Sequence, residues 1–402
     1  MSTPIYRIGD TNVSKGVKED TFLAYKEVGD DFLPIQQGYS RTGSCWVMNK
    51  SGDIVEVPSD VPPVDFMDSL EGEYWLFAGG DNLNTQSHDV TAWSSLNIDN
   101  TPGNGIFYET TTNGSHIAYR DISITSGVSI TAWGIIKPLQ DDRNVRLADL
   151  GGSSTFIVSD VDGNIVAQNF PNGGGGIVRK LTDGSLYLSI TYTSIGTLAR
   201  IGFYSTIDNT TSFAGNPNKG WQVKHLGVDE DIQPRGLIKT SGQIGSANSS
   251  QLTLDFRNQK SDNRNLTFHV QLVKYFHNVS GDQTLVFEKS DGADQFRVWC
   301  NSSGNPGSGV LVTPNVGGYY SPLMYFDLSN TVIRVSNGSI TTFDETGLVQ
   351  SVTAADWISQ SGSVLETITQ IALSSADCSR LKRADVYDTA LTDAECLSLL
   401  GL

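Results

Sequence analysis

The chain has 402 residues and a formal net charge of −17, and it contains 41 glycines against 13 prolines. A charge of this sign repels phosphate backbones and anionic lipid, which disfavours nucleic acid and membrane surfaces as partners. No segment approaches the run of about 18 apolar residues that a membrane-spanning helix needs, so we expect no membrane insertion. Residues 1–6 and the polar stretch after them lack the basic region and apolar core of a secretory signal peptide. We therefore expect the protein to be made and kept in a cytoplasm unless it is released by lysis.

Apolar and polar residues alternate with a period of two along much of the chain, whereas helical periodicity is nearly absent. Turn residues within 49–55, within 161–166 and at Asn337-Gly338 indicate three hairpins. Further predicted strands cover residues 129–136, 186–192, 198–204, 252–256, 266–273, 284–287, 296–299, 332–335 and 340–343. Strands at this density, separated by turns, predict an all-β protein built of antiparallel sandwiches.

One short helix is predicted at the C-terminus. Thr392 is suited to be its N-cap, and Glu395, three residues later, completes a capping box. Gly401 follows as a C-terminal stop signal. We therefore expect a helix over residues 393–400.

Two breaks divide the chain into three parts. Pro58, Pro62 and Pro63 end an N-terminal segment, and the acidic stretch 229–234 is followed by the Ser-, Gly- and Asn-rich stretch 241–250. We interpret the parts as a short β-rich attachment segment and two tandem sandwiches, with the boundaries 1–63, 64–234 and 235–402.

The stretch from Tyr39 to Val57 contains a Ser-Arg-Thr start, an aromatic strand around Trp46 and an Asp-containing hairpin. It resembles a segment of phage virion fibre and appendage proteins, and residues 63–66 and 75–93 fill the places that follow it in that family. This resemblance implies a homotrimer that residues 1–63 attach to other virion proteins. It also implies a virion location and a role in adhesion to a glycan on the host surface.

Two later stretches resemble carbohydrate-recognising folds. Residues 128–133 and 219–234 are similar to a strand and a closing segment of carbohydrate-binding-module-like sandwiches. Residues 383–397, with the run Val-Tyr-Asp-Thr-Ala-Leu-Thr-Asp-Ala-Glu, resemble the closing strand and helix of concanavalin A-like, laminin-G-like lectin domains. The resemblance implies that both sandwiches are of the jelly-roll type.

Aromatic side chains are the main candidates for ligand contact, because the apolar faces of sugars stack on flat rings. Trp221, Tyr319, Tyr320 and Trp357 each sit in a polar, turn-rich context and are our predicted ligand-binding residues. Trp133 alternates with strand hydrophobics, and we expect it to be buried in a core.

No pattern predicts catalysis, a metal site or a cofactor. Cys45, Cys300, Cys378 and Cys396 are too scattered for a zinc site, and the five histidines occur without a metalloprotease or hydrolase motif. Residues 160–164 have the start of a calcium-binding loop but lack its closing Glu, which favours a hairpin turn. We therefore expect a protein that is not an enzyme. Two alternatives remain open: a glycan depolymerase of a phage tail, and a purely architectural decoration protein of a capsid.

Overall fold

The structure is a computed structural model. It describes residues 6–9, 24–28, 31–34, 38–70, 72–76, 78–140, 142–231, 236–249, 251–255, 265–274, 284–288, 295–300, 306–311, 319–324, 330–336, 339–344, 347, 349–352, 370–374, 379–387 and 389–402. Within these ranges the regular structure is almost entirely strand, with one α-helix, α3 (Asp393–Leu399), and one 3₁₀ turn, η2 (Val90–Ala92). The prediction of an all-β protein with a short C-terminal helix is confirmed. None of the described helices is long and apolar enough to cross a membrane.

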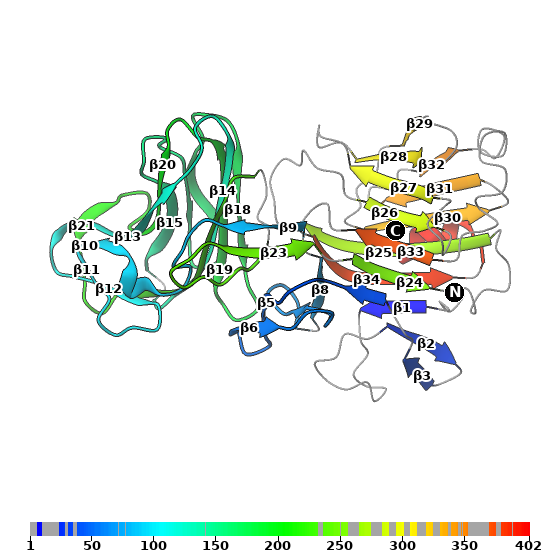
Figure 1. Cartoon of the computed structure of the whole chain (residues 1–402), viewed down its shortest axis with the longest axis horizontal. Helices are drawn as coiled ribbons and strands as arrows, with labels where there is room; N and C mark the ends of the chain where they lie inside the picture. The colour runs from blue at the N-terminus through cyan, green and yellow to red at the C-terminus, as the bar shows by residue number, and fades with distance from the viewer. Residues whose placement is uncertain are drawn as a thin grey trace.

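Two sheets form the first lobe, on the left of Figure 1. The seven-stranded sheet runs in the order β10 (Ser94–Leu96), β13 (Asn113–Ser123), β20 (Leu198–Thr206), β15 (Asn144–Asp149), β16 (Phe156–Ser159) and β17 (Ile165–Asn169), with β21 (Ser212–Ala214) beside β13. The six-stranded sheet runs in the order β11 (Ile98–Asp99), β12 (Ile106–Glu109), β22 (Gly220–Asp229), β14 (Ser129–Pro138), β19 (Leu186–Thr193) and β18 (Gly175–Lys180). Strands β14, β18 and β19 of the six-stranded sheet lie on the side of this lobe nearer the second lobe (Figure 1).

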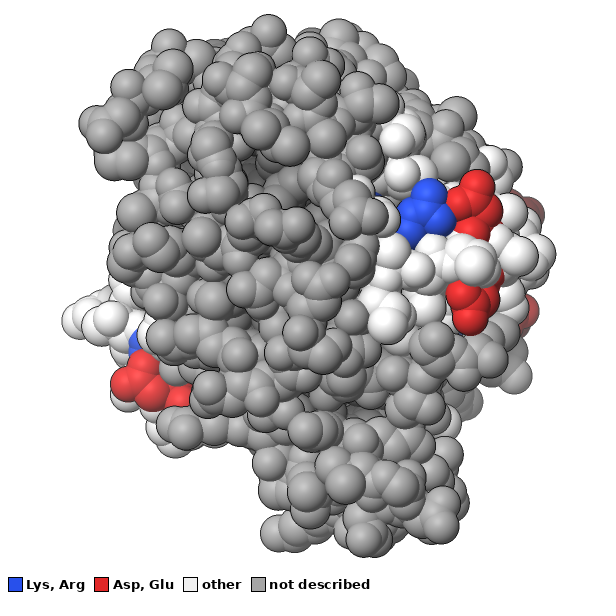
Figure 2. All heavy atoms as spheres, turned by 90° about the vertical axis from the view of Figure 1, so that its right-hand side faces the viewer, with Lys and Arg blue, Asp and Glu red and all other residues white. Residues whose placement is uncertain are grey.

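The second lobe combines strands from both ends of the chain. Its ten-stranded sheet runs in the order β3 (Asp31–Pro34), β2 (Ala24–Val28), β1 (Tyr6–Gly9), β34 (Ser379–Tyr387), β25 (Asn265–Lys274), β30 (Asn330–Ser336), β31 (Ser339–Asp344) and β32 (Val349–Val352), with β8 (Glu73–Leu76) on β34 and β7 (Val64–Asp65) on β8. Its seven-stranded sheet runs in the order β29 (Tyr319–Met324), β28 (Pro306–Leu311), β27 (Gln295–Cys300), β26 (Thr284–Glu288), β33 (Gln370–Ser374), β24 (Gln251–Asp255) and β4 (Gly38–Ser40). On the face drawn in Figure 2, basic and acidic side chains of the described residues lie next to each other.

The three predicted hairpins are confirmed. Strand β5 (Cys45–Met48) pairs with β6 (Ile54–Val57), β16 pairs with β17, and Ser336 of β30 stands opposite Ser339 of β31. Helix α3 begins at its predicted cap: Thr392 Oγ1 accepts a hydrogen bond from Glu395 N, and the Glu395 carboxylate accepts one from Thr392 N. The helix ends one residue before the predicted end.

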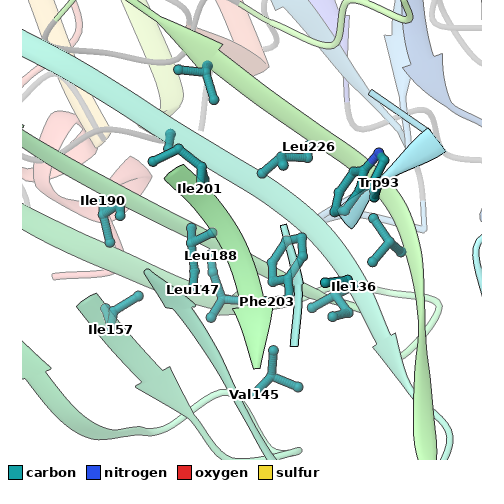
Figure 3. Close-up of a cluster of buried hydrophobic side chains, with 14 of the residues drawn as sticks. Trp93, Ile136, Val145, Leu147, Ile157, Leu188, Ile190, Ile201, Phe203 and Leu226 are labelled. Atoms are coloured by element: carbon teal, nitrogen blue, oxygen red, sulfur yellow. The ribbon is translucent and has the colours of Figure 1, made fainter. Parts of the chain in front are cut away.

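The main core lies between the two sheets of the first lobe (Figure 3). Alternate residues of each strand point into it, as the period-two pattern requires. In β20, Ala199, Ile201 and Phe203 are all 0% exposed and belong to this core. Opposite them, Leu188 and Ile190 of β19 come from the other sheet. Both sheets are therefore held together by apolar side chains that extended-strand periodicity places on one face.

A second core lies on the outer face of the six-stranded sheet. There the hairpin β5–β6 covers Trp133, which is 1% exposed and buried as expected, together with Ile135 and Tyr187. Lys224 of β22 links the hairpin to the sheet, because its Nζ donates hydrogen bonds of 2.6 Å both to Gly52 O in the hairpin and to the Asp183 carboxylate. The hairpin β5–β6 from the N-terminal part of the chain therefore buries the outer face of the six-stranded sheet around Trp133.

A two-stranded ribbon, β9 (Ala78–Asn82) with β23 (Gly245–Ser249), connects the two lobes (Figure 1). The pairings also unite distant segments, since Tyr6 of β1 stands opposite Val386 of β34 and Tyr39 of β4 stands opposite Leu252 of β24. The division at residues 63 and 234 stays a prediction. The pairings add that strands of the first 40 residues share sheets with strands that follow residue 250.

Candidate functional site

The four aromatic residues predicted from the sequence do not form a site in the described part of the chain. Trp221 lies in β22 opposite Phe107 of β12, and its indole is 1% exposed within the main core. A sugar needs an open ring face, so the structure corrects the expectation for Trp221: its indole packs against Phe107, with ring centroids 6.1 Å apart. Tyr319 and Tyr320 begin β29, but their side chains lie outside the described residues, as does the whole of Trp357.

Another set of aromatic and basic side chains lies on the outward face of the seven-stranded sheet in the first lobe. It consists of Tyr119 from β13, Arg146 from β15, Phe156 from β16, and Arg200 and Tyr204 from β20, and we call it the arginine–aromatic face. All five side chains are partly exposed. The labelled strands of this sheet that carry the face, β13, β15 and β20, lie on the side of the first lobe away from the second lobe (Figure 1).

Strand alternation puts these side chains outward. In β20 the buried residues Ala199, Ile201 and Phe203 point into the core, so Arg200 and Tyr204 point to the other side. The register then sets the neighbours across strands, because Arg146 stands opposite Tyr204. Directly opposed and diagonal residues of adjacent strands are in contact range.

Arg146 is stacked between two rings. Its guanidinium carbon lies 3.6 Å from the centroid of the Phe156 ring and 5.4 Å from that of the Tyr204 ring. Burial lowers the pKa of the Arg146 guanidinium below its usual value and raises the pKa of the Tyr204 phenol. Among the described residues none accepts a hydrogen bond from Arg146, and its Nε is buried without a partner.

Arg200, on the same face, has a different environment. Its Nε and Nη2 donate to the two carboxylate oxygens of Asp121 at 2.6 and 3.1 Å, and its guanidinium lies 4.8 Å from the Tyr119 ring centroid. The hydrogen bond to Asp121 raises the pKa of Arg200. The face therefore has one guanidinium that Asp121 neutralises and one that no described residue neutralises.

Small residues lie between the larger side chains. Gly202 stands opposite both Tyr119 and Ala148, and a Cβ on Gly202 would be 2.4 Å from Ala118 O and 2.6 Å from Tyr119 Cβ. Only glycine fits this close approach of β13 and β20. The central strands can therefore pair closely while the rings and guanidinium groups occupy the surface around them.

The side chains of the arginine–aromatic face are of kinds that bind ligands. Partly exposed rings supply flat apolar surfaces, and a guanidinium supplies several donors in a fixed plane. Of the described carboxylates near these side chains, Asp121 is engaged by the Arg200 guanidinium, and Asp149 accepts hydrogen bonds from the Arg200 and Gly151 backbone. Within the described ranges, no group of three His, Cys, Asp or Glu residues is placed to hold a metal ion.

The most elaborate polar network elsewhere in the first lobe is structural. Glu109 is 1% exposed and accepts hydrogen bonds from Arg143 at 2.8 and 3.2 Å, from the Ser205 hydroxyl and from the Asn216 backbone. Burial raises the pKa of Glu109, but these donors outweigh burial and hold it below its usual value. A buried carboxylate with this many donors links β12, β20 and two loops, so its role is structural.

Reasoning from the sequence did not select the arginine–aromatic face. The alternation in residues 198–204 does indicate that Arg200 and Tyr204 lie opposite the apolar residues of that strand. Arg146 and Phe156 belong to other strands, and the sequence contains no local signal that they meet. The missing information was the order of strands in the sheet.

No protein-family model matches the chain, and no curated protein matches it significantly.

Proposed function

We propose that this protein is a non-enzymatic glycan-binding protein and that it is a structural protein of a phage virion, in a head or tail fibre or appendage. The observation that supports binding is the arginine–aromatic face, in which Arg146 lies between Phe156 and Tyr204 on an open sheet surface. Rings of this kind stack on the apolar faces of sugars, and guanidinium donors orient the polar groups.

The arrangement of the sheets supports the part of the proposal that concerns jelly-roll sandwiches. Each lobe contains two antiparallel sheets, and in the first lobe both sheets contribute to one core, which suits a sandwich of the jelly-roll type. The resemblance to phage fibre proteins and lectin-like domains supports the virion role, attachment through residues 1–63 and a homotrimer. A shallow face gives weak contacts, and repeated copies on a particle make such contacts strong.

Binding of the full-length protein to an array of bacterial surface glycans tests the first part. We expect wild type to bind, and the pair of substitutions Phe156→Ala and Tyr204→Ala to abolish binding with an unchanged circular dichroism spectrum. Tyr108→Ala is the matched control, because Tyr108 is a partly exposed tyrosine on the other sheet of the same lobe. Binding that survives loss of both rings contradicts the assignment of this face.

The virion role is tested separately. Mass spectrometry of purified particles from the source phage should detect the protein in stoichiometric amount, and its absence would contradict the structural role. New reducing ends after incubation with host polysaccharide would instead support a depolymerase. A protein that is found in particles but is silent on glycans and on host cells would support a purely architectural decoration.

A further inference from the structure

We infer that the arginine–aromatic face selects acidic glycans, and that Arg146 receives the carboxylate of a uronic or sialic acid unit. This inference rests on the proposed glycan-binding function and adds the class of ligand and the residue that chooses it.

The first observation is the unmatched charge of Arg146. Arginines elsewhere in the first lobe have acceptors: Arg143 donates to Glu109, Arg200 donates to Asp121, and Arg120 donates to Ala92 O at 2.6 Å. In the part of the chain that the structure describes, Arg146 makes no ion pair and donates no hydrogen bond, and its Nε is shielded from solvent. Because Nε cannot reach solvent, the donors left for an external anion are Nη1 and Nη2, which are not among the buried atoms and have no hydrogen-bond partner among the described residues.

The second observation is the composition of the whole chain. Aspartate and glutamate number 44 against 27 lysine and arginine residues, so carboxylates outnumber cations. With this excess an arginine is expected to acquire an internal partner easily. A partly exposed guanidinium that has no partner among the described residues is therefore a local exception in a negative field, and an acidic ligand is the chemistry that complements it.

The third observation concerns geometry. The planar guanidinium lies over Phe156 at 3.6 Å, with Tyr204 on the adjacent strand. A planar fork matches the two oxygens of a carboxylate, and the neighbouring rings can receive the sugar that carries it. Phosphate and sulfate groups are tetrahedral, phosphate also carries more charge, and proteins usually bind such groups with several cations. The second guanidinium of this face, Arg200, is already paired with Asp121 and leaves only one cation for such a group. A carboxylate is therefore the favoured anion.

The test compares glycans that differ only in the charge of a carboxylate. The full-length wild-type protein is titrated with two pairs of glycans. The first pair is trigalacturonic acid and its methyl ester, and the second is 3′-sialyllactose and lactose. Tri-sulfated chondroitin fragments serve as the sulfate probe. We expect at least one acidic member of a pair to bind about tenfold or more tightly than its neutral counterpart, the scale of one charge-assisted hydrogen bond. Arg146→Met should remove this preference and leave weak neutral binding through the rings. Arg146→Lys should retain part of the preference, because it keeps the charge and loses the planar fork.

Lys180→Met is the matched control, since Lys180 is a half-exposed cation on the other sheet of the first lobe. It should keep the full acidic preference. The thermal midpoint of Arg146→Met should stay near that of wild type, because no ion pair with a described residue is lost. Equal affinity for charged and neutral members, a preference that survives Arg146→Met, or stronger binding of the sulfated probe overturns the inference and leaves glycan binding itself intact. No binding of any glycan by wild type would refute the proposed function as well.

Discussion

Replacing His225 should make the first lobe less sensitive to acid. His225 lies in β22, is 0% exposed and packs beside Trp133, with ring centroids 6.2 Å apart. Among the described residues neither ring nitrogen has a hydrogen-bond partner. Burial, with smaller contributions from His88 and Lys239, lowers the pKa of His225 from 6.5 to about 3.

This shift links protonation to unfolding. Well above pH 6.5 the imidazole is neutral in both states, so His225 introduces almost no pH dependence there. Below this value the unfolded chain binds a proton that the folded lobe does not, and stability falls by up to about 1.4 kcal/mol per pH unit. Between pH 7.5 and pH 4.5 the loss from His225 alone is therefore about 2.7 kcal/mol, and it stops growing near pH 3, where the folded form also protonates.

The measurement is the free energy of unfolding in urea at pH 7.5, 6.5, 5.5 and 4.5, followed by tryptophan fluorescence. His225→Leu and His225→Gln both remove the titration, and Gln also keeps a buried polar group. Between pH 7.5 and pH 4.5, the free energy of unfolding of both variants should fall by about 2.7 kcal/mol less than that of wild type. Every other titrating group is common to the three proteins. A difference below about 0.5 kcal/mol would show that the buried, neutral state assigned to His225 is incorrect.

Three further predictions concern packing. Glu109→Gln should lower the free energy of unfolding by about 3 kcal/mol in urea titration, because it leaves Arg143 without its buried counter-charge. Gly227→Ala should lower it by about 1–3 kcal/mol, since the added Cβ would lie 2.3 Å from a ring carbon of Trp133. Cys45 should resist iodoacetamide at pH 8 in the native protein and react in urea, as peptide mass spectrometry can show, because burial raises the pKa of its thiol to about 12.

The Glu109 and Gly227 predictions each have a control variant, and for Cys45 the urea-unfolded protein is the reference. Asp162→Asn removes a carboxylate from an exposed pair with Lys180 and should cost less than about 1 kcal/mol. Gly196→Ala places a Cβ where no atom lies within 4 Å, so it should leave stability nearly unchanged. Equal losses in a variant and its control, or labelling of native Cys45 at the rate of a free thiol, would contradict the packing described.

Local structure was largely predictable from the sequence. Predicted residues 129–136 correspond to β14 (Ser129–Pro138), and residues 186–192 correspond to β19 (Leu186–Thr193). These successes depend on strand alternation and on turn residues, which act within a few positions of each other. The capping box at Thr392 is local in the same sense, and it is present.

Contacts between distant strands were not predictable. The polar residues around Trp221 suggested exposure, but its register with Phe107 puts it in the core. The cover over Trp133 comes from a hairpin at residues 45–57, and nothing in either stretch identifies the other as its partner. Arg146 and its two rings come from three strands, so the candidate face exists only once the strand order is known.

The ribbon of β9 and β23 makes the first lobe a transferable unit. Asn82 and Gly245 stand opposite each other where the chain leaves and returns, so the intervening residues begin and end side by side. A segment of this kind can be exchanged for another by a single insertion event without moving the flanking chain. The exchange has one condition: the hairpin β5–β6 covers Trp133 from outside the segment. A graft of residues 83–244 without it would expose that tryptophan, so a working transplant must carry both pieces.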